Sequence, residues 1–469
     1  AARPAPMARR GLRAACALTL AAGAAALVTR TQVVPGPHAD QPGAYRQRLV
    51  NSNDAVYQTE LNIGGQSMHG IIDTGSSELL VFARRCATCG KAALYDEHLS
   101  KGFERGHRNS SQNYGSGSCD TEDGRDNISI GTLAPHRQAL WMAVNCQMPV
   151  LSSAAFNALV GVAPPGYPEL VARRRLANVQ KMAASYGKRQ LPVPSEVTQA
   201  QVAIQAEVDD ALAKPSLLEN LGLKSFSVCM GRAVGSPGWL VWHDAPRTGQ
   251  AGLQRFEAVG EATWSVRLQK VSLVHGRGTP ISLGCEKGCT AALDSGTSLL
   301  GMPSDMASAL RSSLGSQHAS CDNIGGFPDL LLQVDGQELR LPPASYVGYL
   351  TGRLNEDMNN LMRWESLSDV GRPCQLLVMD VGRSKGPQGP VVVLGLPFFR
   401  EFYTTFDLGQ GPGQRSISVA RAGRDCLPEV HKPAVGGQRY MEDRGVRALD
   451  AATLRGPRWL NSEEEQVVM

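Results

Sequence analysis

Two short segments of this 469-residue chain repeat the same pattern around an aspartate. Residues 71–77 read IIDTGSS and residues 292–298 read ALDSGTS, and more apolar residues follow each of them. Aliphatic residues before an aspartate favour a buried strand, and the glycine after it allows a tight turn that another backbone can approach closely. The neighbouring hydroxyl side chains can donate hydrogen bonds to the carboxylate. The pattern predicts two carboxylates at the ends of rigid strands, one in each half of the chain.

A carboxylate duplicated in this way indicates a pair that meets at a pseudo-twofold axis. Two carboxylates that lie side by side do not both ionise, so one keeps a proton while the other loses it. Such a pair supplies a general acid and a general base together. We therefore expect Asp73 and Asp294 to form a catalytic dyad whose apparent pKa values belong to the pair and not to either residue.

Further segments follow the first aspartate in a definite order. Residues 112–118 read QNYGSGS, residues 156–163 read FNALVGVA, residues 391–395 read VVVLG and residues 397–407 read PFFREFYTTFD. These segments resemble the flap, the strand beneath the first aspartate, its counterpart in the second half and the closing segment of the pepsin-like (A1) aspartic proteases. The resemblance covers roughly residues 55–422.

The resemblance implies a mainly β, bilobal pepsin-like fold with a pseudo-twofold axis and a central cleft. It predicts an N-terminal lobe over residues 45–230 and a C-terminal lobe over residues 231–422. The implied activity is that of an aspartic endopeptidase, in which Asp73 and Asp294 activate a water while a flap closes over an extended peptide. The resemblance implies neither a cofactor nor a metal, and it implies a monomer that acts on peptides or proteins.

The resemblance to the family also implies roles for other residues of these motifs. Ser76 and Thr297 match the hydroxyls that brace the outer carboxylate oxygens of the dyad. Substrate contacts are expected from the glycines after the aspartates, from the flap and from the strand beneath the first aspartate. The positions concerned are Gly75, Tyr114, Gly115, Ser116, Leu159, Gly296 and Thr297.

The sequence departs from the family pattern just after the first motif. Family members commonly have a tryptophan there, whose indole bonds to the flap tyrosine, whereas this chain has Glu78, Leu79 and Leu80. Tyr114 therefore loses that partner. A catalytically silent protein that holds a peptide or protein in its cleft is the alternative function, although the retention of both aspartates and both hydroxyl braces favours the enzyme.

The 11 cysteines suggest an oxidising compartment. Six of them match the family's three bridges, which would be Cys86–Cys89, Cys285–Cys289 and Cys321–Cys374. The first two spacings would also fit a zinc or redox site, which their positions beside the two aspartate turns disfavour. The partners of four other cysteines stay open: Cys119, Cys146, Cys229 and Cys426. A bridge between Cys119 and Cys146 would cross the base of the flap.

Charge and the N-terminal residues bear on location. With 47 basic and 43 acidic residues, the chain shows no excess charge that would indicate nucleic-acid binding. Residues 1–30 contain a basic stretch and then an apolar, alanine-rich run over 14–28, which predicts a signal peptide or an uncleaved signal anchor. We expect a secretory-pathway protein, either secreted or held in an acidic vacuole- or lysosome-like compartment, with membrane contact only through such an anchor.

Three segments have no counterpart in the family pattern. Residues 31–44 leave no room for the basic prosegment that usually inhibits zymogens of this family. Residues 169–213 have helical spacing and many basic side chains, which predicts a helical insertion that is either a surface decoration or a gate that brings a cation near the dyad. The regular pattern fades after residue 422, which predicts a disordered tail over 423–469.

Overall fold

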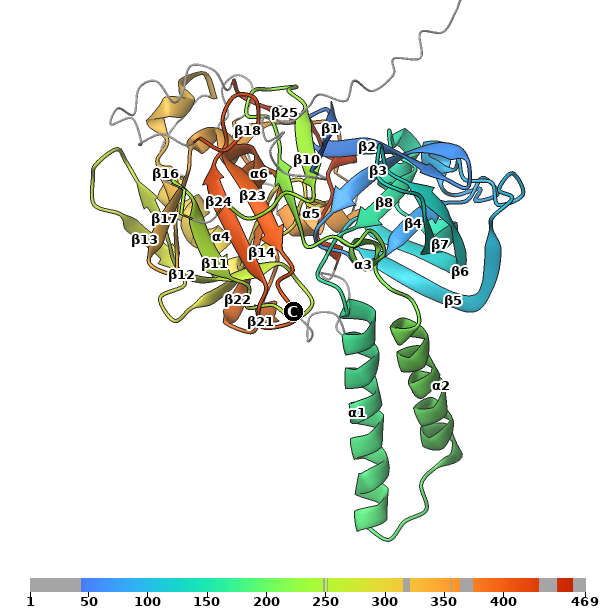
Figure 1. Cartoon of the computed structure of the whole chain (residues 1–469). Coiled ribbons are helices and arrows are strands. Elements are labelled where there is room, and N and C mark those ends of the chain that lie inside the picture. The colour runs from blue at the N-terminus through green and yellow to red at the C-terminus, as the bar shows by residue number, and fades with distance from the viewer. Residues whose placement is uncertain are drawn as a thin grey trace, which may run out of the picture. The chain divides into compact units, whose positions relative to one another are not determined.

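The computed structural model describes residues 44–247, 249–250, 252–314, 321–354, 356–362, 374–429 and 445–458 (Figure 1). These residues lie in one compact unit. The predicted signal segment and nearly all of the segment 31–44 lie outside the described residues. Within the described ranges, no helix has both the length and the apolar character needed to cross a bilayer.

Strands dominate these residues, in agreement with the predicted mainly β fold. The strands of the first lobe are β1 (Tyr45–Ser52), β2 (Val56–Ile63), β3 (Gln66–Asp73), β4 (Leu79–Phe82), β5 (Glu104–Tyr114), β6 (Gly117–Ser129), β7 (His136–Gln147), β8 (Ala158–Gly161) and β9 (Ser225–Cys229). Those that follow along the chain are β10 (Gly238–Trp242), β11 (Gln254–Glu257), β12 (Ser265–Val274), β13 (Ile281–Gly284), β14 (Cys289–Leu293), β15 (Leu300–Met302), β16 (Asp329–Val334), β17 (Gln337–Leu341), β18 (Val347–Thr351), β19 (Gln375–Leu376), β20 (Val378–Asp380), β21 (Lys385–Gly386), β22 (Gly389–Leu394), β23 (Phe402–Asp407), β24 (Ser416–Arg421) and β25 (Ala448–Asp450).

Helices are fewer and mostly short. The α-helices are α1 (Tyr167–Lys188), α2 (Ser195–Leu212), α3 (Leu217–Asn220), α4 (Ser304–Leu314), α5 (Glu356–Met362) and α6 (Leu396–Glu401). The 3-10 helices are η1 (Gly90–Ala92), η2 (Pro149–Ser153), η3 (Cys321–Gly326), η4 (Pro343–Ser345) and η5 (Ala451–Thr453).

Each lobe contains a copy of the same four-strand unit. In the first lobe, β8 pairs in parallel with β3 and antiparallel with β4, and β4 pairs in parallel with β7. In the second lobe, β22 pairs in parallel with β14 and antiparallel with β15, and β15 pairs in parallel with β20. The inner strands are continuous apolar runs because both of their faces are buried. Asp73 ends β3 and Asp294 directly follows β14, so the two aspartates stand at equivalent points.

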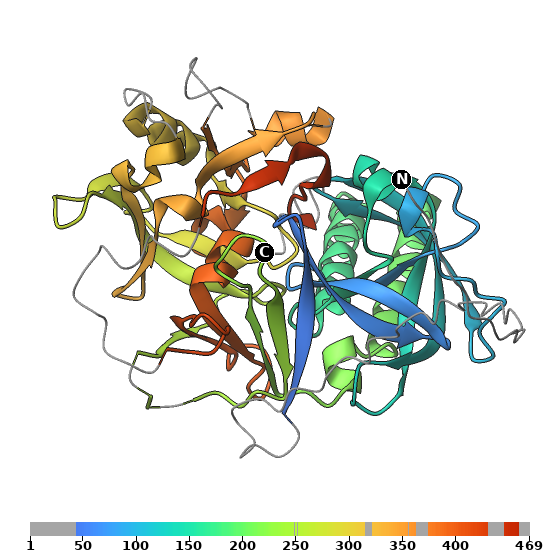
Figure 2. The ribbon, with the colours of Figure 1, turned by 90° about the horizontal axis from the view of Figure 1, so that it is seen from above.

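One continuous sheet joins the two lobes. Strand β1 pairs with β2 on one side and with β10 on the other, and the sheet continues through β9, β23 and β24. Figure 2 shows the blue strand β1 between the lobes. On this sheet Phe226 stacks on Phe406 with 4.9 Å between ring centroids, and Trp264 packs against both rings. The indole Nε1 of Trp264 donates a 2.9 Å hydrogen bond to the carbonyl of Val162 in the first lobe.

Strands β5 and β6 form a long hairpin at the predicted flap position. Its tip pairs Tyr114 with Gly117 across Gly115 and Ser116. Strand β6 pairs along its length with β7, so the base of the hairpin is part of the first-lobe sheet. The pairing of β6 with β7 therefore supports the hairpin below its tip.

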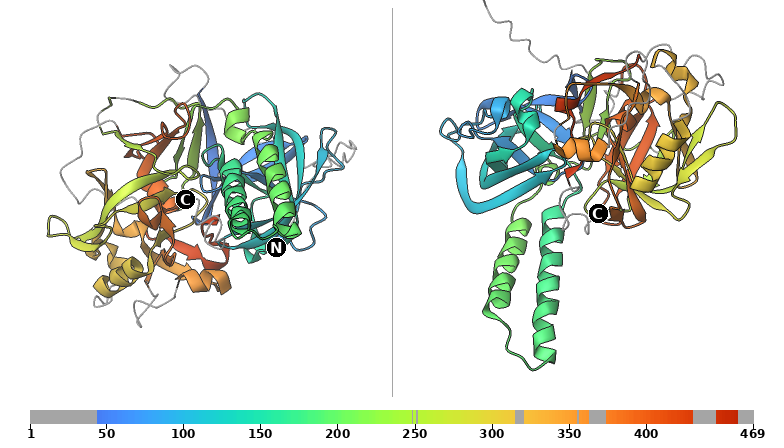
Figure 3. Two further views of the ribbon diagram at one scale, coloured as in Figure 1. Left: turned by 90° about the horizontal axis from the view of Figure 1, so that it is seen from below. Right: turned by 180° about the vertical axis from the view of Figure 1, so that it is seen from behind.

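The insertion is a pair of helices, α1 and α2, that lie side by side (Figures 1 and 3). A small apolar core holds them together, and it consists of Ala172, Leu176, Ile204 and Val208. Basic residues of α1 pair with acidic residues of the hairpin itself, as in Arg175–Glu207 and Arg173–Glu169.

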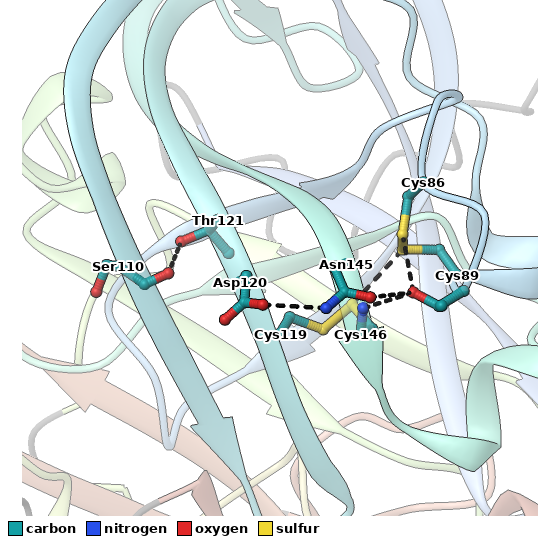
Figure 4. The surroundings of a disulfide bond; sticks show 9 residues. Cys86, Cys89, Ser110, Cys119, Asp120, Thr121, Asn145 and Cys146 are labelled. Carbon is teal, nitrogen blue, oxygen red and sulfur yellow. Dashed lines mark hydrogen bonds between the residues drawn. A yellow bond between two sulfur atoms is a disulfide. The ribbon is translucent and has the colours of Figure 1, made fainter.

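Five disulfides link the described cysteines. They are Cys86–Cys89, Cys119–Cys146, Cys229–Cys426, Cys285–Cys289 and Cys321–Cys374. Figure 4 shows Cys119–Cys146 joining β6 to β7 beside Cys86–Cys89, with 3.5 Å between the sulfurs of Cys89 and Cys146. Three of these sulfurs lie close enough for a metal site, but all of them are in disulfides and offer no thiolate.

The tail differs from its prediction. The disorder predicted for residues 423–469 is wrong for residues 423–429, where Cys426 is buried in a disulfide, and for residues 445–458, which contain strand β25, paired in parallel with β18, and the turn η5. Residues 454–458 are all buried. Contacts with both lobes order the segment 445–458, and no local periodicity in its sequence predicts those contacts. The parts of the tail over 430–444 and 459–469 lie outside the described residues.

The aromatic cluster on the shared sheet makes a testable prediction about stability. The side chain of Phe406 is fully buried between Phe226 and Trp264. Its replacement by alanine leaves a cavity, so we expect Phe406→Ala to lower the free energy of unfolding by about 3–5 kcal/mol in urea titration. Val202 is 69% exposed on α2, and Val202→Ala should change this free energy by less than about 0.5 kcal/mol. Equal effects of the two substitutions would contradict the packing described here.

Candidate active site

The two predicted aspartates come together between the lobes. A Cβ atom added to Gly75 would lie 2.7 Å from the carboxyl carbon of Asp294, and one added to Gly296 would lie 2.3 Å from Oδ1 of Asp73. Each carboxylate therefore packs against the glycine backbone of the opposite loop. Both glycines are required by this close approach, because any side chain would overlap a carboxylate.

Asp73 is held by its own loop. Its Oδ1 accepts a 2.9 Å hydrogen bond from the backbone N–H of Gly75, and its Oδ2 accepts a 2.8 Å hydrogen bond from the hydroxyl of Ser76. The residue is only 3% exposed. These two bonds fix the orientation of the carboxylate, and Ser76 lies where the sequence predicts a brace.

Asp294 has the equivalent partners. Its Oδ1 accepts a 2.8 Å bond from the N–H of Gly296, and its Oδ2 accepts a 2.6 Å bond from the hydroxyl of Thr297. Burial and, after it, the nearby charge of Asp73 raise the pKa of Asp294 well above the usual range for an aspartate. The bonds from Thr297 and Gly296 and the positive charge of Arg455 act in the opposite direction. The carboxyl group of Asp294 is thus suited to keep a proton that an ordinary aspartate would lose.

Reciprocal hydrogen bonds lock the two loops to each other. The N–H of Thr74 donates to Oγ of Ser295 at 3.1 Å, and the N–H of Ser295 donates to Oγ1 of Thr74 at 2.8 Å. Each hydroxyl also donates across the axis, that of Thr74 to the carbonyl of Leu293 at 2.9 Å and that of Ser295 to the carbonyl of Ile72 at 2.7 Å. The sequence predicts that hydroxyls beside the aspartates donate to the carboxylates, but those of Thr74 and Ser295 donate to backbone carbonyls across the axis. The signal was present, however, since a serine or threonine follows the aspartate in both copies.

The tip of the β5–β6 hairpin, at the predicted flap position, is buried. Tyr114 is 2% exposed and Ser116 is fully buried. Leu80 stands where the family's indole is expected and is buried in β4. The guanidinium of Arg458 lies over the ring of Tyr114, with 5.7 Å from its central carbon to the ring centroid. An arginine from the tail is therefore a neighbour of the flap tyrosine that the sequence did not predict.

Two other predictions concern the surroundings of the dyad. Leu159 lies in β8 between Ile71 and Leu80 and is buried in the core, so its role in a substrate subsite stays a prediction. One of the two predictions for the insertion was that it brings a cation near the dyad. The basic residue that acts on Asp294 is instead Arg455, which belongs to the tail.

Comparisons with known proteins agree with this geometry. The profile of the family described as "Eukaryotic aspartyl protease" matches residues 56–189 and 219–421, which is more than half of the chain. The chain belongs to this family. Gastricsin from Homo sapiens is 26% identical over 370 residues, which cover 76% of this chain and 80% of the relative. Pepsin A from Bos taurus is 23% identical over 375 residues, covering 77% and 84%, and cathepsin E-B from Xenopus laevis is 25% identical over 376 residues, covering 77% and 79%.

The gap in the family match contains the whole of the second insertion helix, and the match ends before the tail. Residues 190–218 include α2, and residues 422–469 include β25 and the buried residues 454–458. The family therefore accounts for the lobes and the dyad. Helix α2 and the tail beyond residue 421 lie outside the family match, whereas α1 lies within it.

The reciprocal bonds between the loops make a second prediction. Thr74→Ala removes the acceptor of the Ser295 N–H and the donor to the Leu293 carbonyl, which leaves two buried polar groups unsatisfied. We expect the free energy of unfolding to fall by about 2–4 kcal/mol in urea titration. The exposed Thr198 on α2 supplies the matched control, and Thr198→Ala should have little effect. A Thr74→Ala variant as stable as the control would refute the cross-axis bonds.

Proposed function

We propose that this protein is an aspartic endopeptidase that uses Asp73 and Asp294 to hydrolyse peptide bonds. The observation that carries the proposal is the symmetric pair of buried carboxylates, each braced by one hydroxyl and one backbone N–H and each packed on the opposite glycine. Family membership supports the same reaction class.

The proposed reaction is a direct attack by water. The ionised carboxylate takes a proton from the water, and the oxygen of that water bonds to the carbonyl carbon of the scissile peptide. The neutral carboxyl group gives its proton to the carbonyl oxygen, which produces a tetrahedral diol. A proton then moves from the diol, through the dyad, to the peptide nitrogen as the C–N bond breaks. The products are a carboxylic acid and an amine, and the dyad again holds one proton.

The β5–β6 hairpin is the proposed flap. Its tip residues Gly115 and Ser116 would hydrogen-bond the backbone of an extended substrate in the manner of an added strand. Gly75 and Gly296 would contact the substrate from below, since their backbones adjoin the dyad. Apolar side chains around the scissile bond are expected because apolar residues surround the aspartate strands.

The disulfides support a secretory route, in which oxidising conditions let them form. The alternative function, a silent protein that only binds a peptide, draws on the missing indole at Leu80. The intact bracing of both carboxylates favours catalysis.

The first functional prediction concerns the dyad. We expect Asp73→Asn and Asp294→Asn each to lower kcat for an unfolded protein substrate by at least about a thousandfold at acid pH, because either change removes a proton-transfer group. Pepstatin should inhibit the unmodified chain. The exposed residue Asp305 at the start of α4 provides the matched control, and Asp305→Asn should retain full activity. Undiminished hydrolysis in either dyad variant would contradict the proposal, and tight pepstatin binding without turnover would favour the silent alternative.

The second functional prediction concerns the pH dependence of hydrolysis. Hydrolysis needs one shared proton, so activity should form a bell in the acid range and fall as pH rises through the raised pKa of Asp294. Thr297→Val removes a bond that favours the ionised form, which raises this pKa further. The alkaline limb should therefore move to higher pH by about one unit. Thr198→Val, a change at an exposed position, should leave it in place. A limb that moves to lower pH would contradict the assignment.

A further inference from the structure

The tail segment 445–458 is fastened to both lobes. Arg447 is 4% exposed, and its Nε lies 3.6 Å from Oδ1 of Asp54. Strand β25 then adds to β18 through register pairs such as Leu350 with Leu449. Leu449 belongs to the hydrophobic core. The first half of the segment is thus packed into the fold.

The second half runs from the turn η5 into the catalytic region. Asp450 caps η5 by accepting a hydrogen bond from the N–H of Ala452, and η5 packs against η2 of the first lobe. We call the following residues 454–458, of sequence LRGPR, the cleft segment. Figure 2 shows the end of this red trace between the strands of the two lobes.

The cleft segment pairs with the loop of the second aspartate. The N–H of Arg455 donates to Oγ of Ser298 at 3.0 Å, and the N–H of Ser298 donates to the carbonyl of Arg455 at 3.0 Å. Ser298 lies four residues after Asp294. The guanidinium of Arg455 lies 5.7 Å from the ring centroid of Phe156, and the residue is 2% exposed.

The flap tip lies directly on the cleft segment. A Cβ atom added to Gly115 would fall 2.7 Å from the backbone carbon of Gly456 and 2.9 Å from the carbonyl oxygen of Pro457. Gly115 is one of the residues proposed to bind the substrate backbone. The backbone of the cleft segment therefore occupies space that a substrate would need.

The side chain of Arg458 contacts residues of the first lobe that form a pocket around its guanidinium. Its guanidinium donates one hydrogen bond to the carboxylate of Glu78 and another, of 2.6 Å, to the side-chain oxygen of Gln112. It lies over the rings of Tyr114 and Tyr167 at 5.7 and 5.9 Å. A carboxylate, an amide oxygen and two aromatic faces are the groups that bind a guanidinium well. Glu78 directly follows the first aspartate motif, so this pocket adjoins the dyad in sequence and in space.

We infer that the cleft segment is an intramolecular inhibitor that competes with substrate, anchored by Arg458 in a pocket that selects basic side chains. This inference rests on the proposed function and deepens it. In the inhibited state the backbone of the segment blocks the space under the flap.

The inference also predicts a substrate preference. When the cleft segment leaves, Glu78, Gln112 and the two tyrosine rings become a subsite for an arginine or lysine of the substrate. Among otherwise identical peptides, those with arginine at the matching position should be cleaved roughly tenfold faster than those with glutamine. In a chain that ends at Thr453, where Arg458 is no longer present to use the same carboxylate, Glu78→Gln should lower the rate for the arginine peptides to near that for the glutamine peptides. A preference that survives Glu78→Gln would overturn the assignment of the pocket.

The first experiment compares the intact chain with a chain that ends at Thr453, which retains β25 and η5. The shortened chain should hydrolyse an unfolded protein at least about tenfold faster at low substrate concentration, since a tethered competitor has been removed. Arg458→Ala in the intact chain tests the same point without truncation and should also raise the rate. Arg277→Ala removes a positive charge at an exposed position of the second lobe and is the control. Equal rates for the intact chain and the Arg458→Ala variant would overturn the inference.

The second experiment separates inhibition from catalysis. A chain that ends at Thr453 and carries Asp73→Asn should bind the synthetic peptide LRGPR in calorimetry. The peptide LRGPA should bind roughly tenfold more weakly, and Glu78→Gln in the protein should abolish that difference. Absence of peptide binding would overturn the inference even if the enzyme is active. Binding with this arginine dependence, together with no hydrolysis by any chain with an intact dyad, would refute the proposed function and leave the cleft segment as the occupant of a binding site.

Discussion

The active site depends on one cross-axis contact, the exchange of hydrogen bonds between Thr74 and Ser295. These bonds join two loops that are 221 residues apart in sequence. Without them, each aspartate would be positioned only by its own lobe, and the distance between the carboxylates would vary with every movement of one lobe against the other. The N–H and hydroxyl groups of Thr74 and Ser295 are all buried and hydrogen-bonded. Because little water reaches them, these bonds are difficult to exchange for bonds to water.

The symmetry of the dyad follows from the strands that carry it. β3 with β8 and β14 with β22 place the two aspartates at matching positions, and matching glycines then let the loops approach. The chemical environments are nevertheless unequal. A serine braces one carboxylate and a threonine the other, and Arg455 acts on the second. Burial and the charge of Asp73 raise the pKa of Asp294 in spite of the opposing effect of Arg455, which gives a physical basis for a pair that shares one proton.

The dyad and the two-lobed fold could be predicted from sequence because their signals are local and occur twice. An apolar strand, an aspartate, a glycine and a hydroxyl lie within seven residues, and the second copy supports the first. The Cys229–Cys426 bridge could not be assigned, since 197 residues separate its ends and nothing local links them. The tail was mistaken for disorder for a related reason. A five-residue segment has no measurable periodicity, and its order comes from Glu78, Ser298 and Gly115, which lie far away along the chain.

The attachment of β25 to β18 has a consequence for how such an inhibitor behaves over time. Withdrawal of residues 454–458 does not require β25 to separate from its sheet, so β25 can stay paired while the described part of the segment leaves. A released segment would remain tethered a few residues from its site, at a high local concentration. It would therefore return whenever substrate becomes scarce. A propeptide that is cut away switches an enzyme on once, whereas a segment fastened in this way would make the response graded and repeatable, with the concentration of substrate as the signal.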